Sequence, residues 1–378
     1  MSVIQWSTPE RRAGDRDLPI LPNEIYLIIF EHIAPTSTRL SPEQLKTFSD
    51  LSHVCKFFAN VCLARTFEYL EFSGNMASRA WILCQQIAAE HPLALSLAQC
   101  VKICRFAGWS LPRDGPWAAQ VLSRMKNIRE VEFFQCYVRK AHWDVITPLE
   151  SLEELSFTLC EFLDGPADVD PGKRSKVKVP RLRVLRCHGD HQPMATIDAR
   201  HLRTLGIDSD FDGIDWLSGT ALTELYVYGN EERYVETMSR QVRLKHILSE
   251  LPQTIQVLWL PVYPGSHIEL FGDSVWKSIP LLRSLTLEEV EQFPGIAPMT
   301  VFRMVCEGAR VHRGLQSFTL RSFTRRLAVK VSPDEVRHTV EEQLNDISGL
   351  NFVDVFGVAI RLVDGKWMID VRDSDSVL

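Results

Sequence analysis

The stretch Leu152-Glu153-Glu154-Leu155-Ser156-Phe157 follows the pattern apolar-x-x-apolar-x-apolar, and this pattern recurs along most of the chain. The last two apolar positions are two residues apart, so they point to the same face of a short strand. A single unit of this kind cannot bury its apolar edge by itself, whereas stacked units share one continuous core. Copies of the pattern begin at residues 67, 101, 128, 152, 182, 202, 222, 255, 282 and 315.

The spacing of these copies is typical of leucine-rich repeats. Neighbouring copies start between 20 residues (182 to 202) and 34 residues (67 to 101) apart. Between copies, apolar residues at helical spacing predict return helices around 80–88, 117–125, 242–251 and 301–306. The sequence therefore predicts an α/β fold, an irregular leucine-rich-repeat solenoid with parallel strands on the inside of an arc and helices outside.

The ninth position of the repeat supports this prediction. A small polar side chain at that position bonds the backbone that turns away from the strand. Two cysteines, Cys136 and Cys160, are thereby expected to have a structural role. The residues found at the ninth position are Asn75, Cys136, Cys160, Asp190, Asp210 and Asn230.

The first part of the chain instead predicts three short helices. Pro22 suits the first turn of a helix that continues through Ile25, Ile28, Ile29 and Ile33. The stretch Ser41-Pro42-Glu43-Gln44 predicts a capping box at the start of a second helix that buries Leu45 and Phe48. Asp50 is expected to cap a third helix, with Cys55 as a small buried apolar residue. The predicted apolar face of that helix consists of Leu51, Val54, Cys55, Phe58, Val61 and Cys62.

The last part of the chain departs from the repeat. Residues 332–347 predict a helix, and two alternating stretches around Asp364-Gly365 predict a β-hairpin. We expect this segment to cap the last repeat, because the ends of a solenoid must cover its core. The predicted organisation is a disordered tail (1–17), a helical module (18–66), the repeat array (67–330), the cap (331–372) and a second tail (373–378).

Residues 18–72 resemble the F-box family, through Leu21-Pro22-Asn23-Glu24-Ile25 and the later Leu51-Ser52-His53-Val54-Cys55-Lys56-Phe57-Phe58. With the repeats, nearly the whole chain resembles F-box proteins with C-terminal leucine-rich repeats. The resemblance implies a substrate receptor that docks a Skp-type adaptor and thereby a cullin–RING ubiquitin ligase. The adaptor-binding residues that it implies are Leu21, Pro22, Ile25, Ile29, Leu51, Val54, Cys55 and Phe58.

A target protein is expected to bind the inner face of the array, where side chains alternate with the buried ones. Tyr226, Tyr228 and Trp259 fall on neighbouring repeats, and aromatic side chains are favoured anchors at interfaces. The alternative is that loops or the C-terminal segment cover these rings. The candidate target-binding residues are Phe134, Arg186, His188, Tyr226, Tyr228, Trp259 and Arg321.

Composition sets further limits. The 378 residues are 45% hydrophobic and 24% charged, which is typical of a globular chain, and the net charge of -6 gives no general reason to expect nucleic acid as a partner. No apolar run approaches the ~20 residues of a membrane span. The 9 cysteines include no Cys-x-x-Cys pair, which predicts reduced thiols in a cytoplasmic or nuclear protein without a metal or cofactor.

No motif in the sequence predicts catalysis. A Gly-rich phosphate loop, a Gly-x-Ser-x-Gly elbow and a His-Glu-x-x-His pair are all absent from the sequence. The cluster at 187–191, Cys-His-Gly-Asp-His, is expected to point its side chains in different directions. Two alternatives to the substrate receptor remain: a binding module whose adaptor complex ubiquitinates no target, and a hydrolase on an irregular α/β fold.

Overall fold

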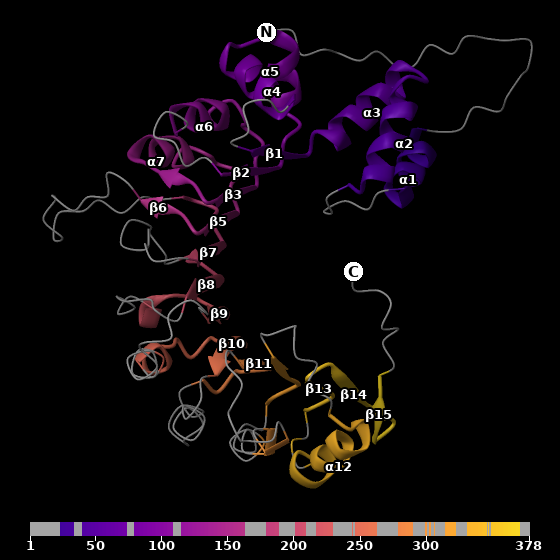
Figure 1. The fold of residues 1–378 in the computed structure, drawn as a ribbon, viewed down its shortest axis with the longest axis vertical. Helices are drawn as coiled ribbons and strands as arrows, with labels where there is room; N and C mark the ends of the chain where they lie inside the picture. Colours follow the sequence, from indigo (N-terminus) through magenta and orange to yellow (C-terminus); the bar gives the residue numbers. More distant parts are fainter. Residues whose placement is uncertain are drawn as a thin grey trace, which may run out of the picture. The chain divides into compact units, whose positions relative to one another are not determined.

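The structure is a computed structural model of an α/β protein whose sheet strands are mostly parallel (Figure 1). The chain divides into two compact units, Met1–Arg181 and Leu182–Leu378. The structure describes residues 23–33, 40–73, 79–108, 115–162, 179–188, 201–208, 217–229, 244, 246–262, 279–289, 299–300, 302–303, 306, 314–322, 331–345, 347 and 349–370.

The first unit begins with three helices, α1 (Asn23–Ile33), α2 (Pro42–Ser52) and α3 (Lys56–Thr66). Their shared core is built on Phe30, Phe48 and Cys62, all buried. The Phe30 ring centroid lies 5.9 Å from that of Phe48 and 5.1 Å from that of Phe58, so each helix contributes an aromatic ring. The predicted capping box at Ser41 is confirmed, because the Gln44 N–H donates to Ser41 Oγ and the Ser41 N–H donates to Gln44 Oε1.

Three details of the predicted helices are wrong. Asp50 lies inside α2 and caps nothing, because α2 continues to Ser52 and ends where the Val54 N–H donates to the Leu51 carbonyl oxygen. Cys55 takes the N-cap position of α3 and is exposed, not buried in a helix face. Leu45 is 40% exposed, because its side of α2 has no neighbour in the core around Phe48.

The sheet of the first unit is parallel, with the strand order β1-β2-β3-β5. Two short strands, β4 and β6, pair with each other outside it. The helices that follow the strands lie on one side of this sheet (Figure 1). The elements are β1 (Tyr69–Ser73), α4 (Arg79–Ala88), α5 (Pro92–Ala98), β2 (Ile103–Ala107), α6 (Gly115–Leu122), β3 (Glu130–Phe134), β4 (Tyr137–Val138), α7 (Lys140–Ile146), β5 (Glu154–Thr158) and β6 (Glu161–Phe162).

A ladder of four phenylalanines runs through the core of this unit. Phe72, Phe106, Phe133 and Phe157 occupy the same register position of the four strands, and all are buried. Successive rings are stacked, with centroids 5.5, 5.5 and 5.4 Å apart. The last apolar position of the repeat pattern therefore holds neighbouring strands together through ring contacts.

The ninth position of the repeat behaves as predicted where it is described. Cys136 Sγ donates to the Phe106 carbonyl oxygen at 3.2 Å, and Cys160 Sγ donates to the Phe133 carbonyl oxygen at 3.2 Å. Each buried thiol thus bonds the backbone of the preceding strand. The other predicted ninth-position residues, Asn75, Asp190, Asp210 and Asn230, lie outside the described residues.

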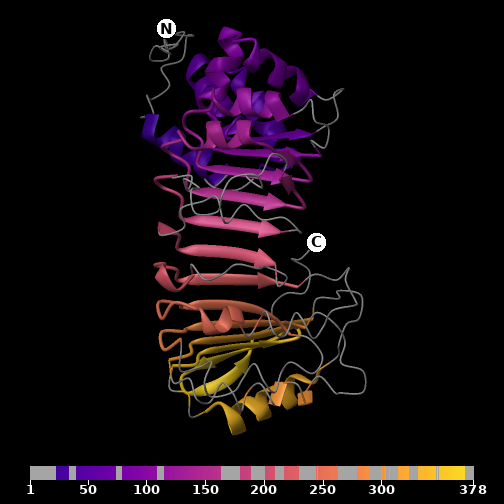
Figure 2. The same cartoon turned by 90° about the vertical axis from the view of Figure 1, so that its left-hand side faces the viewer.

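The second unit continues the same strand pattern. Its strands follow one another in the order β7 to β13 with parallel pairing wherever a register is described, and β14 and β15 are added antiparallel (Figure 2). The elements are β7 (Val184–His188), β8 (Thr204–Asp208), the 3-10 helix η4 (Leu217–Gly219), β9 (Glu224–Tyr228), β10 (Val257–Val262), β11 (Ser284–Glu289), β12 (Ser317–Ser322), α12 (Pro333–Gln343), β13 (Phe352–Val355), β14 (Val358–Val363) and β15 (Lys366–Ile369).

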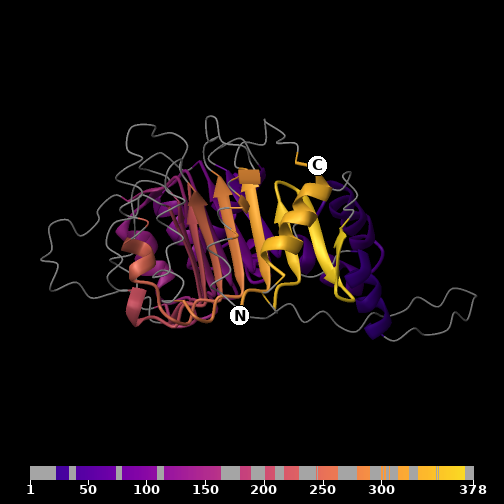
Figure 3. The ribbon, with the colours of Figure 1, turned by 90° about the horizontal axis from the view of Figure 1, so that it is seen from below.

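Every copy of the pattern found in the sequence forms a strand, so this prediction is confirmed. The C-terminal helix and hairpin are also confirmed. Asp364 and Gly365, with φ of 50° and 76°, turn the chain between β14 and β15, and α12 packs against both strands (Figure 3). The predicted tails, 1–17 and 373–378, lie outside the described residues.

Strand β13 is missing from the sequence prediction. Leu350, Val353 and Val355 are buried and follow the same apolar-x-x-apolar-x-apolar pattern. The repeat pattern that predicts a strand is therefore present in the sequence between helix α12 and the β14–β15 hairpin. β13 pairs parallel with β12 and antiparallel with β14, so it joins the repeats to the hairpin.

Candidate binding surfaces

Helix α1 has apolar residues on two sides. On one side, Tyr26 and Phe30 pack against Phe58 with ring centroids 5.3 and 5.1 Å away. The other side exposes Ile25, Ile28 and Ile29 by 40%, 50% and 45%, at the i, i+3, i+4 spacing of one helix face. Contiguous apolar surface of this kind marks a binding site more often than chance exposure does.

The structure separates the predicted adaptor-binding residues into two groups. Ile25, Ile29, Val54 and Cys55 are exposed, the last two in the connection between α2 and α3. Leu51 and Phe58 are half-buried and pack against the core of the three helices, so they contribute to that core more than to the exposed surface. The structure does not describe Leu21 and Pro22.

Two residues of this surface were missed by sequence reasoning. Leu27 and Ile28 are 48% and 50% exposed, beside the predicted Ile25 and Ile29. The run from Ile25 to Phe30 is apolar all round, so helical spacing alone could not tell its buried side from its exposed side. The deciding information is that Phe30 packs on Phe48, which requires the tertiary structure.

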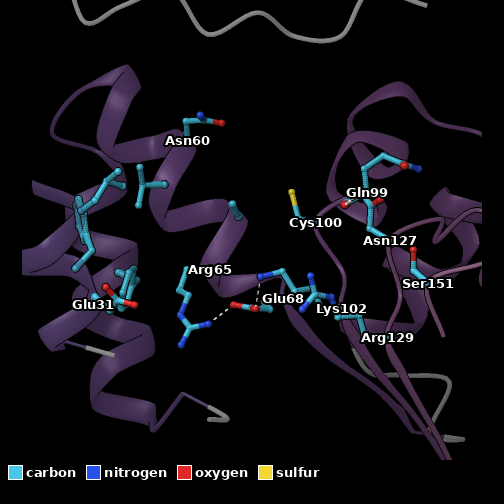
Figure 4. Close-up of a pocket in the computed structure, with 15 residues that line it drawn as sticks. Glu31, Asn60, Arg65, Glu68, Gln99, Cys100, Lys102, Asn127, Arg129 and Ser151 are labelled. Atoms are coloured by element: carbon cyan, nitrogen blue, oxygen red, sulfur yellow. Dashed lines mark hydrogen bonds and ion pairs between the residues drawn. The ribbon is translucent and has the colours of Figure 1, made fainter. Parts of the chain in front are cut away.

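A groove of about 680 Å³ lies between the three helices and the first strands of the same unit (Figure 4). Leu27, Phe30 and Val61 contribute apolar atoms to one wall, and Lys102 and Arg129 contribute charge to the other. The groove thus offers an amphipathic surface next to the exposed face of α1.

Glu68 links the two walls of this groove. It accepts a hydrogen bond from Lys102 Nζ at 2.6 Å and is also paired with Arg65 (Figure 4). Burial raises the pKa of Glu68, but the hydrogen bonds and positive charges of Lys102 and Arg65 outweigh burial and leave it below its usual value. The carboxylate is therefore ionised at neutral pH. It connects Arg65 in α3 with Lys102, which directly precedes β2.

In the second unit, Tyr226, Tyr228 and Trp259 form an aromatic cluster on the face of β9 and β10. Ring centroids lie 6.4 Å apart for the two tyrosines, 6.1 Å for Tyr226 and Trp259, and 6.5 Å for Tyr228 and Trp259. All three side chains are half-buried, so each ring keeps an accessible part. The predicted proximity of these residues is confirmed.

Polar groups hold the rings of this aromatic cluster in place. Tyr226 Oη donates to Glu224 Oε2 at 3.3 Å, and Trp259 Nε1 donates to Glu288 Oε2 at 3.3 Å. Burial and the Glu224 charge raise the pKa of Tyr226, so the phenol keeps the proton that it donates. Burial also raises the pKa of Glu288, despite the Trp259 N–H and the charge of Arg321.

Gly206 makes room for Tyr228. A Cβ at this position would lie 3.0 Å from Tyr228 Cε2 and 3.2 Å from Arg186 Cγ. Both side chains therefore lie across the middle of β8, where any larger residue would displace them. Sequence reasoning missed Gly206, because a strand glycine signals close approach only when the neighbours on both sides are known.

The remaining predicted target-binding residues are placed as follows. Arg321 is exposed and its Cζ lies 5.3 Å from the Trp259 ring centroid, and Arg186 lies next to Gly206. Phe134 belongs to the first unit, where the Arg105 guanidinium lies 5.0 Å from its ring centroid. His188 ends β7, and its side chain lies outside the described part.

Burial keeps several cysteine thiols in their protonated form. Burial raises the pKa of Cys62 and Cys160 to about 11 and that of Cys84 to about 12, so these thiols stay protonated at neutral pH. None of the nine cysteines, all within the described part, is in a disulfide. Cys187 is buried, and residues 189–191 of its cluster are not described.

No protein-family model matches the chain, and no curated protein matches its sequence. Among the described residues, no three or more His, Cys, Asp or Glu side chains are grouped to hold a metal ion. In the same part of the chain, no helix is long and apolar enough to cross a membrane.

Exposure predicts one reactive cysteine. A maleimide at neutral pH should label Cys55 roughly tenfold or more faster than the buried Cys62, Cys84 and Cys104, because only an accessible thiol reacts. Peptide mass spectrometry over a time course measures the rates, and Cys55→Ser should remove the fast phase. Equal labelling of Cys84 and Cys55 in the folded chain would contradict the placement of α3.

Proposed function

We propose that this chain is a non-catalytic substrate receptor of a Skp–cullin–F-box ubiquitin ligase. Its three N-terminal helices dock a Skp-type adaptor, and the strand face of its second unit that carries Tyr226, Tyr228 and Trp259 binds a target protein. The location in the cell is the cytoplasm or the nucleus, where thiols stay reduced. The repeats that carry the target face are of the leucine-rich type, and the helical module is an F-box.

The observation that carries this proposal is the exposed apolar face of α1. Ile25, Ile28 and Ile29 remain accessible although the helix already buries its other side on Phe48 and Phe58. Three helices of 11 residues each make a small core, which is typical of a module that gains stability from a partner. Val54 and Cys55, in the connection before α3, are also exposed.

The repeat strands support the second half of the proposal. Consecutive strands in register present rows of side chains from many repeats, which suits recognition of a protein surface. The aromatic cluster lies on this face, and tyrosine and tryptophan are enriched among interface hot spots. The receptor acts by proximity: holding a target beside the ligase raises the effective concentration of its lysines.

Co-expression with a Skp-type adaptor tests the proposal. We expect a complex on size exclusion, and we expect Ile29→Glu to weaken it by roughly 30-fold or more, because a charge would replace an apolar anchor in the contact. Ile82→Glu is the matched control: Ile82 lies in α4 of the same unit and is 52% exposed, close to the 45% of Ile29.

Circular dichroism and thermal unfolding should be unchanged in both variants, since neither side chain is buried. Adaptor binding that Ile29→Glu leaves intact would refute docking through α1. Addition of a cullin–RING pair to the complex separates the two remaining functions: a recruited cullin supports a ligase receptor, and its exclusion from the complex supports a binding module without ubiquitination.

A further inference from the structure

We propose that the aromatic cluster of the second unit, Tyr226, Tyr228 and Trp259, binds a positively charged lysine side chain, methylated or unmodified, of a target protein. We further propose that Arg321 covers part of this site when no target is bound. The inference rests on the proposed function for the existence of a target, and it adds the chemistry by which the target is recognised.

The spacing of the rings fits a small cation. The three centroids form a triangle with sides of 6.1 to 6.5 Å. A group over the middle of this triangle lies within the roughly 6 Å range of a cation–π interaction with every ring. Trp259 is tilted by 46° and 49° from the two tyrosines, which are nearly parallel, so the rings offer faces in more than one direction.

Glu224 adds a negative charge beside the rings. It accepts hydrogen bonds from Tyr226 Oη at 3.3 Å and Thr204 Oγ1 at 3.1 Å, and both donors are neutral hydroxyls. No cation among the described residues forms an ion pair with Glu224. A carboxylate next to aromatic faces favours a cationic ligand over a neutral or anionic one.

Arg321 shows that the cluster already accepts a cation. Its Cζ lies 5.3 Å from the Trp259 ring centroid, and its charge acts on Glu288, which holds the indole N–H. Because Arg321 is exposed, moving its guanidinium into water costs little. A lysine of the target would therefore replace Arg321 over the Trp259 ring, and it would also contact the rings of Tyr226 and Tyr228.

Charges of both signs surround the aromatic cluster. The positive charge of Arg186 acts on Tyr226 and Tyr228, and Arg321 lies over Trp259. The two carboxylates, Glu224 and Glu288, accept hydrogen bonds from Tyr226 and Trp259. Because these carboxylates bond directly to the polar atoms of the rings, we expect the face to favour a cation.

A peptide titration of the whole chain tests this proposal without the adaptor. The probes are one short Gly/Ser peptide with a central trimethyl-lysine, the same peptide with lysine, and the same peptide with the neutral tert-butyl isostere of trimethyl-lysine. By calorimetry we expect the trimethyl-lysine peptide to bind roughly 2- to 30-fold more tightly than the isostere. Equal binding of the charged and neutral peptides, or no binding of either, would overturn the proposal.

Variants locate the site. Trp259→Ala should abolish binding and Glu224→Gln should weaken it, whereas Arg321→Ala should strengthen it by a few-fold because the competing cation is gone. Arg361→Ala is the matched control, since Arg361 is also exposed and lies 5.5 Å from the Phe352 ring centroid, and it should change nothing. Weaker binding in Arg321→Ala would contradict the competition.

The peptide result and the adaptor result are independent of each other. Adaptor docking depends on α1 in the first unit, and the peptide depends on β9 and β10 in the second. Failure of the peptide to bind a chain that still binds the adaptor refutes the lysine site alone. Binding of the peptide by a chain that binds no adaptor refutes the receptor function alone.

Discussion

Phe133→Ala should lower the free energy of unfolding by about 3–5 kcal/mol, the largest effect of any substitution considered for this chain. Phe133 is buried in the middle of the phenylalanine ladder, with Phe106 and Phe157 stacked on its two sides at 5.5 and 5.4 Å. The His142 ring also meets it edge-on at 5.5 Å. Removal of the ring leaves a cavity that these three ring neighbours cannot fill.

Phe134→Ala provides the control for this prediction. Phe134 is the next residue of β3, has the same chemistry, and points to the opposite face, where it is half-buried under Arg105. Its loss should cost about 1 kcal/mol, which is ordinary for a partly exposed side chain. Denaturant unfolding measures both values, and similar losses for the two variants would mean that the rings do not form a central ladder.

The second large effect depends on pH. His142 is buried and its Nδ1 accepts the Arg139 backbone N–H at 3.0 Å, so the ring is neutral in the folded chain. Burial lowers the pKa of His142 from 6.5 to about 4. The unfolded chain therefore takes up this proton more readily than the folded chain.

The stability contributed by the neutral ring is fully present above pH 6.5. It should fall as the pH decreases from 6.5 to 4, by about 1.4 kcal/mol per pH unit and about 3 kcal/mol in total, and then level off. His142→Gln removes the titrating group, so its unfolding free energy should change less over this window, whatever its stability at neutral pH. Identical pH dependence in the variant and the natural chain would contradict a buried neutral His142.

Much of the fold could be predicted from the sequence because one short pattern repeats. Each copy places two apolar residues two positions apart and forms a strand, and those residues are buried in every copy except at Leu70. The position of Cys136 and Cys160 was informative for the same reason, since their thiols bond the preceding strand. Repetition lets many weak local signals support one interpretation.

The errors lie where tertiary contacts decide. The α2–α3 boundary was misplaced because residues 48–58 carry continuous helix signals, and only the hydrogen bonds at Leu51 end α2. The exposed side of α1 could not be identified because Ile25 and Phe30 are equally apolar. Glu288 and Gly206, which shape the aromatic cluster, depend on neighbours 29 residues (Trp259) and 20 residues (Arg186) away in the chain.

Complex formation between this chain and a Skp-type adaptor shows directly whether α1 is a docking helix. We expect a complex that Ile29→Glu disrupts and Ile82→Glu preserves, with Cys55 shielded from maleimide when the adaptor is bound. Docking through α1 would be contradicted if the folded chain formed no complex, or if Ile29→Glu left the complex as stable as before.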